Sequence, residues 1–279
     1  MNVYGAARGA RVLVFDSGLG GLTVLAAVAR SRPDVELIYA ADDAFFPYGA
    51  LGEPELVARV GEVVAGLIER CAPDLAVIAC NTASTLVLAP LRTAFPGLPF
   101  VGTVPAIKPA AEASRTRLVS VLATPGTVAR DYTRALVRDF AGDCEVTLVG
   151  SARLAGLAER FLRGEAIDEA EIAREIAPCF VERGEGRTDQ VVLACTHFPL
   201  LIEHFDRLAP WPVDFVDPAP AIARRVDALL GGRRGAPRTP GALSPAIFTS
   251  GRAPSAELQK ALRRLGLTAT SADERAAAI

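Results

Sequence analysis

Residues 75–84 read LAVIACNTAS and residues 190–199 read QVVLACTHFP, and these two stretches share one pattern. Each is a short apolar run that ends in alanine and cysteine. A threonine follows Cys195 directly and follows Cys80 after one intervening residue. Apolar runs of this length are typical of strands that are buried on both faces. We therefore expect two equivalent strands, each with a cysteine at its carboxyl end.

A second pair of motifs repeats in the same order. VLVFDSGLGG at 12–21 and VSVLATPGTV at 119–128 each place polar residues after an apolar run. The order of one strand and turn, then one strand with cysteine and threonine, is thus used twice, which indicates an internal duplication. We expect a first lobe from residues 1–103 together with 217–279, and a second lobe from residues 104–216.

The rest of the chain alternates short apolar runs with longer amphipathic stretches, which is typical of parallel sheets flanked by helices. Helical periodicity is clear at 56–70, and Asp168 with Glu171 indicates the start of another helix. The fold class is therefore α/β, with two pseudo-symmetric lobes, each a mostly parallel sheet flanked by helices. Residues 231–244, rich in Gly, Pro and Arg, predict an exposed loop. Strands are expected at 11–15, 36–40, 75–79, 118–123, 145–149, 191–194, 214–216 and 246–249.

Composition excludes several classes of protein. The 279 residues are 51% hydrophobic and 22% charged with a net charge of -2, which is typical of a globular protein and gives no basic surface for nucleic acid or membranes. No apolar run is long enough to span a bilayer, and the first ten residues do not resemble a secretory signal, so we expect a cytoplasmic protein. Five cysteines, an odd number, favour free thiols over a disulfide framework. Small molecules are the expected partners.

Ligands of α/β sheets bind beyond the carboxyl ends of the strands, and this rule selects the candidate residues. Some of them have structural alternatives, since Asp16, Asn81 or Thr82 could cap a helix. Cys71, Cys144 and Cys179 are expected to pack in the core, and His204 is expected to be inert on a surface helix. The candidates by this rule are Asp16, Ser17, Cys80, Asn81, Thr82, Cys195, Thr196 and His197.

Cofactor motifs are not found in the sequence. The glycines at 18, 20 and 21 do not have the spacing of a dinucleotide site, and there is no P-loop lysine motif. With two histidines and no C-x-x-C pair, a structural zinc site is not expected. We therefore expect neither a metal nor a cofactor.

Five motifs give the chain a specific resemblance. They are FDSGLGGLTV at 15–24, PYG at 47–49, ACNTAS at 79–84, ATPGTVARDYT at 123–133 and ACTHFPLL at 194–201. The chain resembles the glutamate racemases of the aspartate/glutamate racemase superfamily over almost its whole length. VPAIKPAA at 104–111 is most similar to the proteobacterial type.

The resemblance implies an active site in the cleft between the two lobes. It also implies cofactor-independent racemisation of glutamate by two bases, which supplies D-glutamate for peptidoglycan, cell wall biogenesis and cell shape. Cys195 resembles the base that acts on L-glutamate and Cys80 the base that acts on D-glutamate, with Asp16 and His197 assisting. Inversion of a carbon needs acid/base groups on both faces, and a thiol with a pKa near 8.5 suits that task. The implied substrate contacts are Asp16, Ser17, Tyr48, Gly49, Asn81, Thr82, Thr124, Thr127, Thr196 and His197, with Glu159 nearby.

The resemblance also implies regulation and assembly. The proteobacterial type suggests activation by a peptidoglycan precursor, UDP-N-acetylmuramoyl-L-alanine, and homodimers are common in the family. Two positions depart from the usual pattern: Phe198 replaces a frequent tyrosine, and Asp217-Pro218 replaces Asp-Ser, which removes a hydroxyl and fixes a backbone angle.

Three alternatives remain open at this stage. The chain could racemise another acidic amino acid such as aspartate, hydrolyse a substrate with Cys195 and His197, or bind amino acids without catalysis. Hydrolysis leaves Cys80 without a role. Exchange of the α-proton of L- and D-glutamate with solvent would separate these hypotheses.

Overall fold

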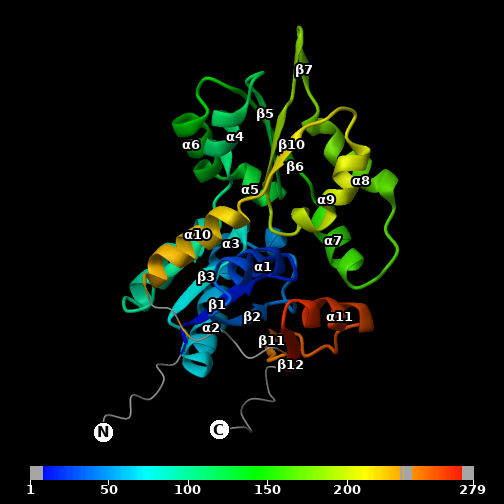
Figure 1. Cartoon of the computed structure of the whole chain (residues 1–279). Coiled ribbons are helices and arrows are strands. Elements are labelled where there is room, and N and C mark those ends of the chain that lie inside the picture. Colours follow the sequence, from blue (N-terminus) through cyan, green and yellow to red (C-terminus); the bar gives the residue numbers. More distant parts are fainter. Residues whose placement is uncertain (1–8, 233–234, 236–240, 272–279) are drawn as a thin grey trace, which may run out of the picture.

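The computed structural model describes residues 9–232, 235 and 241–271, which form two parallel sheets in separate lobes (Figure 1). The first sheet has six strands in the order β12-β11-β2-β1-β3-β4, and all its pairings are parallel. Its last two strands come from the C-terminal part of the chain: β11 pairs with β2, and β12 pairs with β11. The strands are β1 (Arg11–Asp16), β2 (Glu36–Ala41), β3 (Leu75–Ile78), β4 (Phe100–Gly102), β11 (Ser244–Phe248) and β12 (Leu267–Ser271).

The second sheet has four parallel strands in the order β10-β9-β5-β6. They are β5 (Leu118–Ala123), β6 (Glu145–Gly150), β9 (Gln190–Ala194) and β10 (Asp214–Val216). A small antiparallel hairpin, β7 (Glu182–Arg183) and β8 (Gly186–Arg187), precedes β9.

Both sheets share one topology. In the first, β1 lies between β2 and β3, with β4 beyond β3; in the second, β5 lies between β6 and β9, with β10 beyond β9. The order of connection is therefore the same, and β3 corresponds to β9. This confirms the predicted α/β fold with two pseudo-symmetric lobes. The lobe boundaries at 103/104 and 216/217 stay a prediction.

Helices cover both faces of the first sheet because its strands are apolar on both sides. Val12 and Val14 of β1 pack toward one core cluster with α1, α10 and α11, and Leu13 and Phe15 pack toward another with α2 and α3. Neither face of β1 is left to solvent, which explains the absence of a polar alternation in its sequence. The helices are α1 (Gly21–Ser31), α2 (Glu53–Cys71), α3 (Asn81–Ala94), α10 (Ala219–Leu230) and α11 (Ala256–Arg264).

The second sheet is covered in the same way. Val191 and Leu193 of β9 pack with α7, α8 and α9 on one face, and Val192 and Ala194 pack with α4 on the other. The elements of this lobe are α4 (Ile107–Ala113), α5 (Pro125–Ala129), α6 (Asp131–Phe140), α7 (Leu154–Leu162), α8 (Glu169–Ile176), η2 (Ala177–Cys179), η3 (Phe198–Leu201) and α9 (Ile202–Leu208). The short helix η1 (Tyr48–Ala50) belongs to the loop after β2.

All eight strands expected from the sequence are present, with ends that differ by at most two residues. Short β4, the terminal β12 and the β7–β8 hairpin were not expected. Asp168 caps α8 through the backbone N–H of Ala170, as its position before the helix predicts. Cys71 and Cys179 are buried, and Cys144 is half-buried against a core cluster.

Two further predictions concern the surface and the membrane. The loop expected at 231–244 lies partly outside the described residues, since 233–234 and 236–240 are not among them. In the part of the chain that the structure describes, no helix is both long enough and apolar enough to cross a membrane.

Candidate active site

The carboxyl ends of β1 and β3 bring Asp16, Ser17 and Cys80 together. The Ser17 hydroxyl lies 3.7 Å from the Cys80 sulfur. One carboxylate oxygen of Asp16 accepts the backbone N–H of Gly21 at 2.9 Å and so caps α1, as the structural alternative predicts. The other oxygen, Oδ1, is buried and has no hydrogen-bond partner among the described residues. Asp16 thus combines a capping role with an oxygen available to a ligand.

Burial governs the acidity of Cys80. Cys80 precedes the first residue of α3 and is 6% exposed. Burial, followed by the negative charge of Asp16, raises the pKa of the Cys80 thiol well above its usual range, and Cys195 adds to the shift. Cys80 is therefore a thiol at neutral pH, which suits a proton donor.

The second cysteine lies beside a histidine and a carboxylate. Cys195 follows β9, and its sulfur lies 3.9 Å from Nδ1 of His197. The other ring nitrogen of His197 lies 2.9 Å from Oε1 of Glu159 on α7. Oε1 also accepts the backbone N–H of Leu19, from the first lobe, at 2.5 Å. Glu159 therefore orients His197 and ties the two lobes together at the site.

His197 and Glu159 each stabilise the charged form of the other. Burial alone would lower the pKa of His197, but hydrogen bonds with Cys195 and Glu159 and the charge of Asp16 outweigh it and raise that pKa well above 6.5. Burial would raise the pKa of Glu159, but the hydrogen bond and charge of His197 lower it. The pair is an imidazolium beside a carboxylate.

Two glycines of the first lobe make this contact possible. A Cβ atom at Gly20 would lie 2.4 Å from Nδ1 of His197, and one at Gly18 would lie within 2.3 Å of Glu159 Oε1. Both distances are far below van der Waals contact. Gly18 and Gly20 of FDSGLGGLTV are therefore required for the approach of the second lobe rather than for a nucleotide.

A group of hydroxyls joins the lobes on the other side of the site. The Thr82 hydroxyl, on α3, lies 3.1 Å from that of Thr124 and 3.3 Å from that of Thr127, and these two lie 3.0 Å apart. Next to Thr82, Asn81 is 3% exposed, and its amide nitrogen and oxygen have no partner among the described residues. Asn81 therefore does not cap α3, and its amide is available to a ligand.

The remaining candidates contribute in less direct ways. The Tyr48 hydroxyl donates to Asp42 at 2.6 Å, so that it is already occupied, whereas Gly49 lies near Thr124. The backbone carbonyl of Thr196 accepts the Thr23 hydroxyl at 3.2 Å. His204 lies on α9 and pairs with Glu169, away from these groups. Asp42, Phe46, whose ring centroid is 5.3 Å from that of His197, and the N–H of Leu19 were not predicted.

The sequence of the chain matches a known protein family. The model of the Asp/Glu/hydantoin racemase family matches residues 22–226. The chain belongs to this family. The racemase is 60% identical to the glutamate racemase of Brucella anthropi over 223 residues, which cover 80% of each chain. It is 54% identical to that of Brucella ovis over 256 residues, 92% of each chain.

Solved structures agree with the sequence relatives. A crystal structure of Escherichia coli glutamate racemase, in complex with L-glutamate and the activator UDP-MurNAc-Ala, has a TM-score of 0.86 and 40% identity over 95% of this racemase and 98% of that chain. The RacE1 isoform from Bacillus anthracis, at 24% identity and a TM-score of 0.77 over 95% and 98% of the chains, shares the fold. The protein is an amino-acid racemase, an isomerase.

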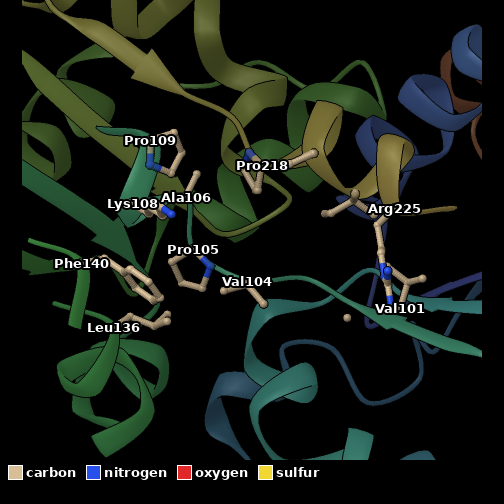
Figure 2. Close-up of a pocket in the computed structure, with 13 residues that line it drawn as sticks. Val101, Val104, Pro105, Ala106, Lys108, Pro109, Leu136, Phe140, Pro218 and Arg225 are labelled. Carbon is tan, nitrogen blue, oxygen red and sulfur yellow. The ribbon is translucent and has the colours of Figure 1, made fainter. Parts of the chain in front are cut away.

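A separate cavity of the racemase, of about 340 Å³, opens where the chain passes between the lobes (Figure 2). Its wall is mostly apolar and includes Val104, Pro105 and Phe140. Lys108 and Arg225 lie on opposite sides of it. Five residues of the segment 104–111 line this cavity, namely residues 104–106, 108 and 109, and so does Pro218, which precedes α10. It is therefore distinct from the cysteines and borders the segments that connect the lobes.

Proposed function

We propose that this racemase interconverts L- and D-glutamate with Cys80 and Cys195 as its two bases and no cofactor. The observation that carries the proposal is the equivalence of the two thiols. Each follows the corresponding strand of a duplicated sheet, β3 or β9, and each has polar groups beside it. Groups from two facing lobes can approach a carbon from opposite sides, as inversion requires.

In the direction from L- to D-glutamate, Cys195 acts as the thiolate and removes the α-proton. Cys80, which burial and Asp16 keep protonated, delivers its proton to the opposite face. The thiol formed at Cys195 and the thiolate formed at Cys80 then serve the reverse reaction or exchange protons with water. His197 hydrogen-bonds to the Cys195 sulfur, and Asp16 offers its free oxygen to the substrate ammonium.

Polar groups of both lobes support a substrate with two carboxylates. Asn81 presents an unpartnered amide, and Thr82, Thr124 and Thr127 present three neighbouring hydroxyls. We assign further contacts to Ser17, Tyr48, Gly49 and Thr196. Loss of one methylene from the substrate would leave buried donors without partners, which costs about 1–3 kcal/mol each. Aspartate should therefore react at least about a hundredfold more slowly than glutamate.

The test is chiral chromatography of L- and D-glutamate, and of both enantiomers of aspartate, after incubation with enzyme dialysed against a chelator. The proposal predicts rapid interconversion of glutamate alone. If kcat/KM for aspartate is comparable to that for glutamate, the enzyme is a racemase of broad specificity. Hydrolysis of thioester or amide substrates without racemisation would favour the alternative that uses Cys195 and His197 alone.

The proposed product, D-glutamate, indicates a role in the cell, and the Escherichia coli relative indicates a regulator. D-glutamate is an amino acid of peptidoglycan, so we propose a role in cell wall synthesis. The Escherichia coli relative binds UDP-MurNAc-Ala as an activator. We propose that the cavity between the lobes takes this precursor, with Lys108 and Arg225 facing its diphosphate. Arg225→Ala should then abolish activation and keep the basal rate, whereas an unchanged wild-type rate with saturating precursor would remove the proposal. A homodimer stays a prediction.

A further inference from the structure

Asp42, which follows β2, is the centre of a buried hydrogen-bond network. Its carboxylate is fully buried and accepts four side-chain hydrogen bonds. Oδ1 accepts from Arg59 and from Thr249, both at 2.6 Å. Oδ2 accepts from the Tyr48 hydroxyl at 2.6 Å and from Nε of Arg59 at 2.9 Å. A buried carboxylate needs this degree of satisfaction, because an unpaired one is strongly destabilising.

The network contains charged groups and contacts candidate residues of the site. Burial alone would raise the pKa of Asp42, but the hydrogen bonds from Arg59, Thr249 and Tyr48 lower it below its usual value. The backbone N–H of Asp42 also donates to the carbonyl oxygen of Asp16 at 2.9 Å. Asp42 is therefore a charged group that is bonded to one candidate site residue through its backbone and to another through its side chain.

Tyr48 connects the Asp42 network to the residues that are proposed to bind the substrate. The tyrosine is 1% exposed, and its hydroxyl points to Asp42 and not to the hydroxyls of the site. A Cβ atom at the next residue, Gly49, would lie 3.8 Å from Thr124, so η1 packs directly against the second lobe. The contribution of Tyr48 is thus to fix the position of η1 and its backbone.

Thr249 comes from a distant part of the chain, just after β11. Its hydroxyl donates to Asp42, and the same oxygen accepts the backbone N–H of Ala44 at 3.2 Å. Its own N–H donates to the carbonyl of Ala41 at 3.1 Å. Residue 249 lies outside the part matched by the family model, residues 22–226. The C-terminal segment therefore supports the loop that carries Tyr48.

We propose that Asp42 is a positioning residue which, held by Arg59 and Thr249, orients the Tyr48–Gly49 backbone for substrate binding. The inference rests on the proposed glutamate racemisation, in which Tyr48 and Gly49 border the substrate. Asp42 touches neither substrate nor thiol and acts through Tyr48. Its loss should affect the binding of glutamate more than the transfer of the proton.

The test uses Thr249→Val, which keeps the shape of the side chain and removes one hydrogen bond to Asp42. We expect KM for glutamate to rise about three- to tenfold and kcat to stay within about twofold. Thr249→Ser restores the hydroxyl and should restore KM. Ser250→Ala is the matched control, because Ser250 makes the same kind of bond to the adjacent Asp43, at 2.6 Å, and should leave KM unchanged.

A double-mutant cycle separates positioning from general stability. Tyr48→Phe removes the link, so Thr249→Val should raise KM less than about twofold further in that background. Independent, multiplicative effects of the two changes, or an unchanged KM in Thr249→Val, would overturn the inference. These two results bear on the inference only if the wild-type enzyme racemises glutamate. A wild-type enzyme that does not racemise glutamate would refute the proposed function itself.

Discussion

Replacement of Glu159 by glutamine should lower the pKa of His197. Glutamine keeps the size of the side chain and an oxygen for the Leu19 N–H, but it removes the negative charge that lies 2.9 Å from His197 Nε2. Hydrogen bonds to charged groups contribute about 1.5–3 kcal/mol. At about 1.36 kcal/mol per pKa unit, the expected decrease is about 1–2 units.

The assay is NMR titration with labelled histidine, which is simple because the chain has two histidines. The raised pKa means that His197 of the wild type keeps its proton through pH 6.5 and loses it only at higher pH. In Glu159→Gln the transition should move to lower pH. His204, bonded to Glu169 on α8, gives an internal reference signal that should not move between the two proteins.

Glu169→Gln is the matched control, since it removes a carboxylate bonded to the other histidine and should leave the signal of His197 in place. Two results would refute the reasoning. One is a wild-type His197 that is already neutral at pH 6.5. The other is a His197 titration that is the same in Glu159→Gln as in the wild type.

Two further predictions concern packing and stability. Gly20→Ala should lower kcat/KM for glutamate at least about a hundredfold, because the added Cβ would lie 2.4 Å from His197. Gly61→Ala is the control, because a Cβ there has no neighbouring atom within 4 Å and kcat/KM should not fall. Steady-state kinetics of both variants checks this prediction. Asp34→Asn should lower the free energy of unfolding by about 3 kcal/mol at pH 7, since Asp34 makes two 2.8 Å hydrogen bonds with the fully buried Arg32. The hydrogen bonds of Arg32 lower the pKa of Asp34, so this stabilisation is present above the unfolded pKa of about 3.9 and disappears as pH falls through the native value. Urea unfolding at pH 7 and pH 3 should give a smaller difference between the proteins at pH 3.

The duplicated motifs predicted the fold because the information is local. Each buried strand appears as an apolar run, and the repeat places Cys80 and Cys195 after equivalent strands. The strands that were missed have weak local signals. β4 lies between prolines at 99 and 105, and β12 reads LTATS, with polar residues at alternate positions. Their pairing with β3 and β11 supplies the stabilisation that their own sequences do not indicate.

The site was predictable to the extent that its residues follow strands. Asp42 follows the strand at 36–41 just as Asp16 follows β1, so the same rule could have selected it. Thr249 also follows a strand, β11, but the predicted strand at 246–249 included it and so concealed this position. Arg59 has no such signal, since it lies within α2. The unpaired atoms of Asn81 and the occupied hydroxyl of Tyr48 likewise depend on tertiary contacts.

The retention or loss of the substrate proton tests the two-thiol mechanism most directly. L-glutamate is incubated in D₂O with catalytic enzyme, and the α-position of both enantiomers is analysed by mass spectrometry within the first few per cent of conversion. In the proposed mechanism Cys195 removes the proton and Cys80 supplies a solvent-derived deuteron, so D-glutamate should be almost fully deuterated and the remaining L-glutamate nearly unlabelled. D-glutamate that retains a substantial share of the original proton would show one base serving both faces and would contradict the account.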